Sequence, residues 1–324
     1  MAVELYKEKY RSQVREVVLG ATKEEGGTRT KTITVGGQTA LPFMYFEGEN
    51  PHRPVVAMEV WDVVPEDWPA SLKNYFEDVY DDPAAWAKKC VEEYGADLIA
   101  LRFKGAHPDG KNASAEDCID VLKKVLEAVG VPLIIFGCGV TEKDNEIIGP
   151  IGEAGAGENL LLGIATQDNY KPVASAAMAH KHCVIAQSPV DINICKQLNI
   201  LIAEMSTPLL DKIIIDPVIS AVGYGIEYTY SIMERARFGA LQGDRMLAMP
   251  CIADVSKEVW SKKEAYVPEE ENPEWGDQAD RSLAWETTTA TAMLHSGTDI
   301  IVLSHPEAVK KIKTHIDELV QGGS

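Results

Sequence analysis

The chain has 324 residues, of which 45% are hydrophobic and 25% charged, and its 50 acidic and 31 basic side chains give a formal charge of −19. This much apolar material offsets the entropy lost on folding, which excludes a disordered chain and fits one large domain or two small ones. The acidic balance argues against nucleic acid and anionic membranes as partners, because both require concentrated Lys and Arg. No apolar stretch reaches the roughly 20 residues of a membrane-spanning helix. The first nine residues carry four charges, unlike a signal peptide, so a cytoplasmic protein is expected.

The first 53 residues are predicted to form an N-terminal extension, and residues 54–324 a separate barrel domain. Residues 15–20, 31–35 and 38–43 are short apolar runs typical of strands, with Gly36-Gly37 as a hairpin turn. Such an extension commonly closes the bottom of a barrel.

From residue 54 onward, short apolar runs alternate with helical patterns. The runs are continuous, as strands covered on both faces require. Between them, Asp82-Pro83 is expected to begin one helix, Ser114 with Asp117 a second, and Pro306 the last. Eight such units in this order predict a (β/α)8 TIM barrel. The predicted strands span residues 54–60, 97–102, 131–136, 159–164, 183–187, 212–216, 247–253 and 299–303.

One connection is too long for an ordinary loop between a strand and a helix. Residues 256–278 contain Trp260, Trp275 and an acidic run. They follow a strand and are therefore expected on the functional face of the barrel.

The six cysteines are spread along the chain without a Cys-x-x-Cys pair. Neither a disulfide framework nor a zinc or iron-sulfur ligand set has this spacing, so buried thiols are expected and no metal site is predicted. The run from His180 to Cys183 (HKHC) resembles metal ligands locally. It falls where a helix is predicted to end, a place that favours His and Lys electrostatically, and we favour that interpretation.

In a TIM barrel, functional side chains lie at the carboxyl ends of the strands. The strand ends hold few paired acids and bases, and the sequence has no Walker loop, Gly-x-Gly-x-x-Gly, His-Glu-x-x-His or Ser/His/Asp arrangement. Hydrolase, kinase and nicotinamide-dependent activities therefore have no support, and no catalytic residue is predicted. The residues predicted to contact a cofactor are Glu59, Trp61, Arg102, Cys138, Ser188, Asp216, Gly223 and Tyr224.

Two of these positions have a second interpretation. Cys138, between Gly137 and Gly139, marks either a close approach of a ligand to the backbone or a tight turn. Asp216 precedes a small-residue loop that ends at Gly225. Its carboxylate either accepts hydrogen bonds from a flat ligand or caps the next helix.

Four long segments are specific enough to indicate a family: residues 18–29, 191–202, 214–237 and 240–246. Over essentially the whole chain, the sequence resembles the small subunit of the corrinoid/iron-sulfur protein of acetogenic bacteria. That family is related to the delta subunit of the archaeal acetyl-CoA decarbonylase/synthase.

The resemblance implies a methyl-carrier subunit of the reductive acetyl-CoA pathway that is not an enzyme by itself. A cobalamin (corrinoid) would rest at the interface between this barrel and a large subunit, which would form a stable heterodimer with the chain and hold the iron-sulfur cluster. The transient partners would be a methyltetrahydrofolate:corrinoid methyltransferase and CO dehydrogenase/acetyl-CoA synthase. The alternative is a stand-alone pterin-dependent methyltransferase.

The family is also related to pterin-binding methyltransferase barrels, from which this chain departs. Those barrels place Asp-x-Asn after the second strand and Asp-Ser-Thr-Asn at the third, where this chain has residues 100–102 (ALR) and 136–139 (FGCG). Only Asp216-Pro217 matches. A buried pterin would leave ring groups unpaired at roughly 1 to 3 kcal/mol each, which argues against folate binding.

Overall fold

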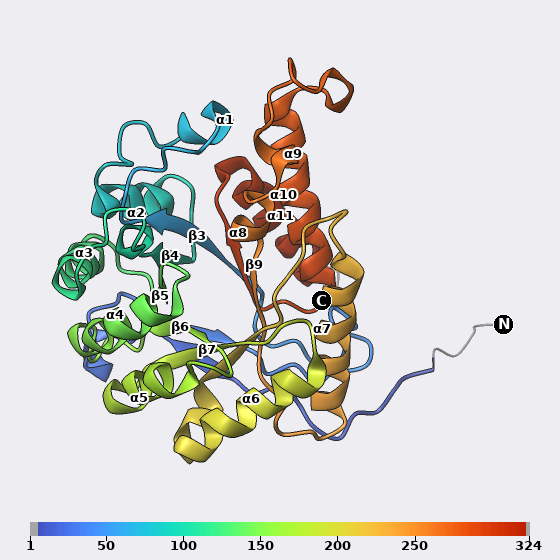
Figure 1. Ribbon diagram of the computed structural model, residues 1–324. Helices are drawn as coiled ribbons and strands as arrows, with labels where there is room; N and C mark the ends of the chain where they lie inside the picture. The colour runs from blue at the N-terminus through green and yellow to red at the C-terminus, as the bar shows by residue number, and fades with distance from the viewer. Residues whose placement is uncertain (1–5, 322–324) are drawn as a thin grey trace.

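Eight parallel strands form the barrel of the computed structural model, one for each strand predicted from the sequence (Figure 1). They are hydrogen-bonded in the order β8-β7-β6-β5-β4-β3-β10-β9, and a bridge from Ile215 to Cys251 closes the ring. The structure describes residues 6–321. Residues 1–5, which belong to the segment compared above with a signal peptide, and residues 322–324 lie outside the described part. The barrel strands are β3 (Val55–Trp61), β4 (Leu98–Arg102), β5 (Leu133–Phe136), β6 (Leu161–Ala165), β7 (Cys183–Gln187), β8 (Ile213–Asp216), β9 (Ile252–Asp254) and β10 (Ile300–Leu303).

Helices surround the strands, and the predicted helix starts are confirmed. The Asp82 carboxylate accepts the backbone N–H of Ala84 at 3.0 Å, and Ser114 and Asp117 form a capping box at the next helix. The helices are α1 (Ala70–Lys73), α2 (Pro83–Glu92), α3 (Ala115–Ala128), α4 (Thr141–Ala154), α5 (Tyr170–His180), α6 (Ile192–Met205), α7 (Ile226–Leu241), α8 (Val255–Val259), α9 (Lys263–Tyr266), α10 (Gln278–His295) and α11 (Pro306–Gln321).

Side-chain alternation along the strands divides the inside of the barrel from its helix-covered outside. The inward positions of the lower strands are apolar, including Val55 and Ala57 on β3 and Leu98 and Ala100 on β4. At the carboxyl ends of the strands, the next inward-facing positions are occupied by polar side chains, which lie in the mouth of the barrel. These side chains are Glu59, Arg102, Asp216, Asp254 and Ser304.

The predicted strand at 247–253 is shorter and later than expected, since β9 begins at Ile252. Pro250 has no N–H to give to a sheet, and its carbonyl accepts the N–H of Ile215 at 2.9 Å. Regular pairing therefore begins only after the proline.

An antiparallel hairpin of β1 (Val17–Leu19) and β2 (Ile33–Val35) precedes the barrel. Its apolar side chains pack against the lower barrel interior. The predicted strand at 38–43 is wrong, because Pro42 cannot donate a hydrogen bond and Phe43 has a φ of 58°. The Gly36-Gly37 turn is also wrong, since the two paired strands are joined by residues 20–32.

Arg29 fastens the segment between β1 and β2 to the barrel. Its side chain is buried, and Nε donates to Glu158 Oε2 at 2.8 Å. Nη2 donates to the carbonyl of Leu126 at 2.7 Å and Nη1 to that of Val129 at 2.5 Å, both at the carboxyl end of α3. The guanidinium thus pairs with a carboxylate and satisfies helix-end carbonyls simultaneously.

Replacing Arg29 with Met should lower the free energy of unfolding by about 3 kcal/mol or more, because Glu158 would be left buried without its cation. Chemical denaturation measures this. The control is Arg53→Met, which breaks the exposed pair with Asp317 at 2.8 Å and should change stability by less than about 1 kcal/mol. Equal effects of the two substitutions would contradict the proposed role of Arg29.

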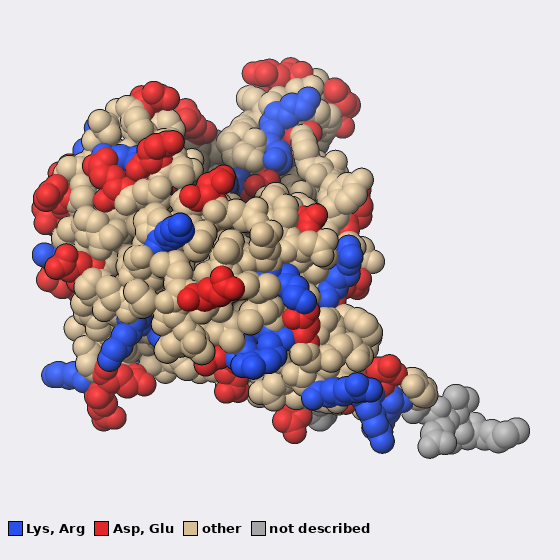
Figure 2. Space-filling model, turned by 60° about the horizontal axis from the view of Figure 1, so that its bottom comes forward, with Lys and Arg blue, Asp and Glu red and all other residues tan. Residues whose placement is uncertain are grey.

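The long connection after β9 projects from the barrel at the mouth end, as expected from the sequence (Figure 1). It contains α8, α9 and a single turn at Pro273–Trp275. Its tip carries a cluster of exposed carboxylates (Figure 2), to which Glu269, Glu270 and Glu271 belong. In the described part of the chain, no helix has the length and apolar character that crossing a bilayer requires.

Candidate functional site

A buried cation between two carboxylates fills the mouth of the barrel. Arg102, at the end of β4, donates from Nε to Glu59 and from Nη2 to Asp254 Oδ2 at 2.7 Å. The three residues are only 3 to 6% exposed. The guanidinium carbon lies 4.3 Å from the centroid of the Phe136 ring, so an aromatic face supports the cation from the barrel interior.

Two hydroxyl groups complete this cluster, which we call the mouth cluster: Glu59, Arg102, Asp254, Ser256 and Ser304. Ser256 donates to Glu59 Oε2, and Ser304 Oγ lies 3.2 Å from the same oxygen. The second oxygen of Asp254 accepts the N–H of Lys257 at 3.3 Å. Each carboxylate oxygen of the cluster is therefore engaged within the protein.

The pKa values of the cluster follow from this pairing. Burial alone would raise the pKa of Glu59, but Arg102 and the Ser256 hydroxyl together lower it. The pKa of Arg102 is raised, since both carboxylates outweigh the effect of burial. The pKa of neighbouring Lys104 is lowered by burial and by Arg102. The cluster is thus a set of buried, paired charges, two carboxylates on one cation, in which every carboxylate oxygen is hydrogen-bonded.

Substituting Arg102 with Met should destabilise the fold by about 3 to 5 kcal/mol, since two buried carboxylates would lose their common cation. Urea denaturation at neutral pH measures the loss. The triple variant Arg102→Met/Glu59→Gln/Asp254→Asn should recover more than half of it, because it removes the unpaired charges. A triple variant no more stable than the single one would contradict this electrostatic account.

Asp216 forms a second polar centre at the mouth. Its Oδ2 accepts Gln187 Nε2 at 2.7 Å and its Oδ1 accepts the N–H of Val218 at 2.9 Å. Burial raises the pKa of Asp216 to about 6. The capping interpretation is wrong, because α7 begins at Ile226 with Gly225 as its N-cap residue.

The raised pKa of Asp216 makes a contribution to stability that depends on pH. The folded state binds this proton more tightly than the unfolded state, so the contribution is full below the unfolded pKa and is lost as pH rises through about 6. Between about pH 4 and pH 7, the wild-type chain should lose up to about 3 kcal/mol of stability relative to Asp216→Asn. Denaturation across this pH range measures the difference, and a pH-independent difference would contradict it.

Two further predicted residues lie outside the mouth cluster: Trp61, at the end of β3, and Ser188, directly after β7. Trp61 packs against Trp68 with ring centroids 5.1 Å apart, and Lys104 Nζ lies 5.2 Å from the Trp61 ring centroid. The Trp61 indole nitrogen has no hydrogen-bond partner within the described residues. Ser188 is fully buried, and its N–H donates to the carbonyl of Asp216 at 3.0 Å.

Cys138 is not part of the mouth cluster. Its N–H donates to Asp144 Oδ1 at 2.7 Å, and a Cβ at Gly137 would lie 2.2 Å from the same oxygen. Because Gly137 has no side chain, the Asp144 carboxylate in the first turn of α4 has room beside it. Burial raises the pKa of the Cys138 thiol to about 11, and all six cysteines are buried and free.

Gly223 and Tyr224 lie in the loop between β8 and α7, where Gly223 has a φ of 83°. Tyr224 is 42% exposed, and its hydroxyl donates to Glu264 Oε2 at 2.7 Å. Beside this loop is a cavity of about 440 Å³ whose lining includes Val222, Trp275 and Trp285. The loop and the projecting connection thus form one rim of the mouth.

Sequence reasoning did not identify Glu286, a buried carboxylate on α10. It accepts the N–H groups of Ser304 at 2.8 Å and His305 at 3.0 Å, and the indole N–H of Trp260 at 3.2 Å. Burial raises its pKa to about 7. A signal existed, because Ser282, Glu286 and Met293 lie on the same core-facing stripe of α10.

The run from His180 to Cys183 has a structural role. Helix α5 ends at His180, followed by Lys181 in a left-handed conformation. The two ring nitrogens of His182 contact the N–H of Leu160 at 3.1 Å and the carbonyl of Gly152 at 2.8 Å, and burial lowers its pKa to about 4. Across residues 6–321, no three His, Cys, Asp or Glu side chains are grouped to hold a metal ion.

Comparison with known proteins assigns the family of this barrel. The model of the CO dehydrogenase/acetyl-CoA synthase delta subunit matches residues 16–303. The chain belongs to this family. The acetyl-CoA decarbonylase/synthase complex subunit delta of Archaeoglobus fulgidus is 38% identical, with 99% of this chain and 72% of that protein covered. The subunit delta of Methanocaldococcus jannaschii is 36% identical over 94% of this chain and 74% of its own length.

Solved structures support the fold. The dihydropteroate synthase of Coxiella burnetii in complex with pteroic acid matches with a TM-score of 0.57 at 12% identity, over 96% of this chain and all of that one. A Xanthomonas albilineans dihydropteroate synthase matches with a TM-score of 0.54 at 15% identity, over 83% and 93% of the two chains. This chain therefore shares the TIM-barrel fold of these synthases.

Proposed function

We propose that this chain is the small subunit of a heterodimeric, cytoplasmic corrinoid/iron-sulfur methyl carrier. In this proposal, the heterodimer takes a methyl group from a methyltetrahydrofolate:corrinoid methyltransferase and passes it to acetyl-CoA synthase. The barrel mouth covers and protects a corrinoid held by the large subunit, which also holds the iron-sulfur cluster. The chain is not an enzyme by itself.

The closed mouth cluster is the observation that carries this proposal. Arg102 occupies the place where a barrel enzyme keeps its reacting groups, and both of its carboxylate partners are nearly inaccessible. General acid or base catalysis needs a group that can exchange a proton with substrate. A mouth cluster of paired charges favours a covering role over bond chemistry.

The rim around this cluster suits a large, flat, partly apolar ligand, as a corrinoid is. The Trp285 ring lines the rim cavity beside Val222, whereas the indole N–H groups of Trp61 and Trp285 are buried. Tyr224 is exposed beside the cavity that Val222 and Trp285 line. These residues would hold the ring edge and exclude water.

When bound, the corrinoid would supply the cobalt that accepts and releases the methyl group. The residues of this chain would keep oxidants and water from one side of the ring. The mouth cluster would present a surface without a free nucleophile.

The oxidation rate of reduced corrinoid in the large subunit tests the covering role. Adding this chain should slow oxidation by a soluble oxidant about tenfold or more, since one face of the ring is shielded. Trp285→Glu should lose most of this protection by placing a charge at the rim. The control is Met178→Glu on α5, away from the mouth, which should protect like the wild type. An oxidation rate unchanged by this chain would overturn the covering role.

A stand-alone pterin-dependent methyltransferase is the second candidate, favoured by Asp216 at the end of β8 and by the likeness to dihydropteroate synthases. It is the weaker candidate, because Gln187 and Val218 already donate to the Asp216 carboxylate. The other two polar anchors of the pterin-binding pattern are also replaced, by residues 100–102 and 136–139.

A further inference from the structure

Two histidine side chains meet on the helix-covered outside of the barrel. His295 is the last residue of α10, His315 lies on α11, and the two helices pack against one another. The Nε2 atoms of the two rings are 3.0 Å apart, and the ring centroids are separated by 5.2 Å. Because 20 positions separate these residues in the sequence, their pairing depends on helix packing and leaves no local motif.

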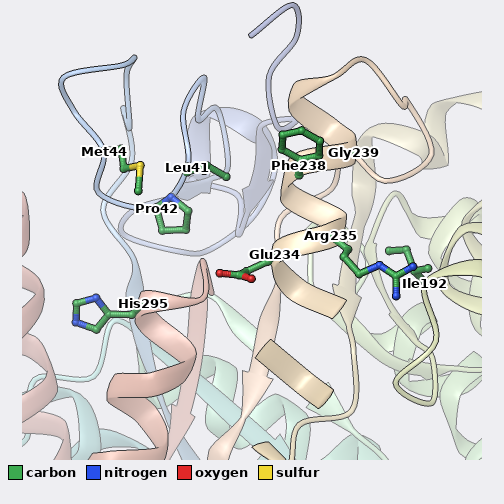
Figure 3. A pocket seen from close by; sticks show the side chains of 9 residues that line it. All are labelled: Leu41, Pro42, Met44, Ile192, Glu234, Arg235, Phe238, Gly239 and His295. Atoms are coloured by element: carbon green, nitrogen blue, oxygen red, sulfur yellow. The ribbon is translucent and has the colours of Figure 1, made fainter. Parts of the chain in front are cut away.

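The histidine pair is accessible from solvent. His295 is exposed, and the His315 side chain is 31% exposed. The Phe43 ring packs against His295 with centroids 5.9 Å apart. His295 also lines the edge of an open groove of about 580 Å³ between the N-terminal extension and α7 (Figure 3). A small ion can therefore reach the two rings from water.

A carboxylate faces the other ring nitrogen of His315. Its Nδ1 lies 3.7 Å from Glu318 Oε2, one turn further along α11. A carboxylate in this place favours the tautomer with the proton on Nδ1, which leaves the Nε2 lone pair directed towards His295. Metal-binding histidines in proteins are commonly oriented by a carboxylate in the same way.

The surroundings of His295 also suit a bound cation. Burial and the neighbouring His315 lower the pKa of His295. At neutral pH its imidazole is therefore uncharged, which is the form that coordinates metal ions. His295 lies in the last turn of α10, where the carbonyl end of the helix dipole attracts positive charge.

The distance between the two ring nitrogens matches the separation of two ligands on one metal ion. With Zn–N bonds of about 2.0 to 2.1 Å, two such nitrogens lie about 3.3 Å apart at the tetrahedral angle and about 2.9 Å apart at a right angle. The observed 3.0 Å lies between these values. Among residues 6–321, no third His, Cys, Asp or Glu completes a group of metal ligands, so water would fill the remaining positions.

We propose that His295 and His315 form a surface site for Zn²⁺, bound by two imidazoles and water. The ion would link the end of α10 to α11, the last two helices of the barrel. Mg²⁺ and Ca²⁺ should not occupy the site, because both prefer oxygen ligands. The site is separate from the mouth cluster, and it stands or falls independently of the proposed function.

Calorimetric titration of the untagged full chain with zinc chloride at slightly alkaline pH tests this site. We expect one saturable Zn²⁺ site, which is lost in His295→Asn and in His315→Asn. His52→Asn is the matched control: His52 is another surface histidine beside a carboxylate, with Nε2 2.9 Å from Glu16 Oε1, and the variant should bind Zn²⁺ like the wild type. Glu318→Gln should weaken binding by about tenfold or more, since this carboxylate orients His315.

Thermal melting gives a second readout, because an ion that binds only the folded chain raises its melting temperature. Zn²⁺ should raise the melting temperature of the wild type and of His52→Asn, but not that of His295→Asn or His315→Asn. No saturable binding by the wild type would overturn the site. Zn²⁺ binding that persists in both His295→Asn and His315→Asn, or Mg²⁺ binding as tight as that of Zn²⁺, would overturn it as well.

Discussion

The buried contact of Arg102 with Glu59 and Asp254 is the interaction on which the rest of the barrel mouth depends. It joins β4 to its neighbour β3 and, across the ring, to β9, and the serine hydroxyls extend it to the end of β10. Burying these groups is costly unless each charge is paired and hydrogen-bonded. A mouth cluster that meets this requirement internally leaves none of its own charges for a substrate, and this constraint favours a covering role.

The same principle appears at the opposite end of the barrel. Arg29 pairs with Glu158 and donates hydrogen bonds to backbone carbonyls at the end of α3. These contacts attach the hairpin segment to the barrel. Buried ion pairs thus secure both ends, while the apolar layers between them provide the bulk of the packing. On the helix-covered outside, α7 carries more exposed aromatic rings than any other element in residues 6–321.

Strand positions were predictable because each barrel strand is a continuous apolar run bounded by helix signals. Errors occurred where one residue overrides such a run: Pro250 delays β9, and Pro42 with Phe43 prevents a strand at 38–43. Fold logic placed Glu59 and Arg102 at strand ends, but their direct pairing depends on the register between the neighbouring strands β3 and β4, which no local pattern contains. Glu286 was missed because it reaches the mouth region from a helix.

The most direct test of the central claim is calorimetric titration of the isolated chain with methyltetrahydrofolate, with Asp216→Asn measured in parallel. If paired charges close the barrel mouth, neither protein should show saturable binding, because displacing a buried ion pair is costly and the other polar anchors of a pterin site are absent. Stoichiometric binding by the wild-type chain that is lost in Asp216→Asn would contradict the account and favour a pterin-dependent enzyme.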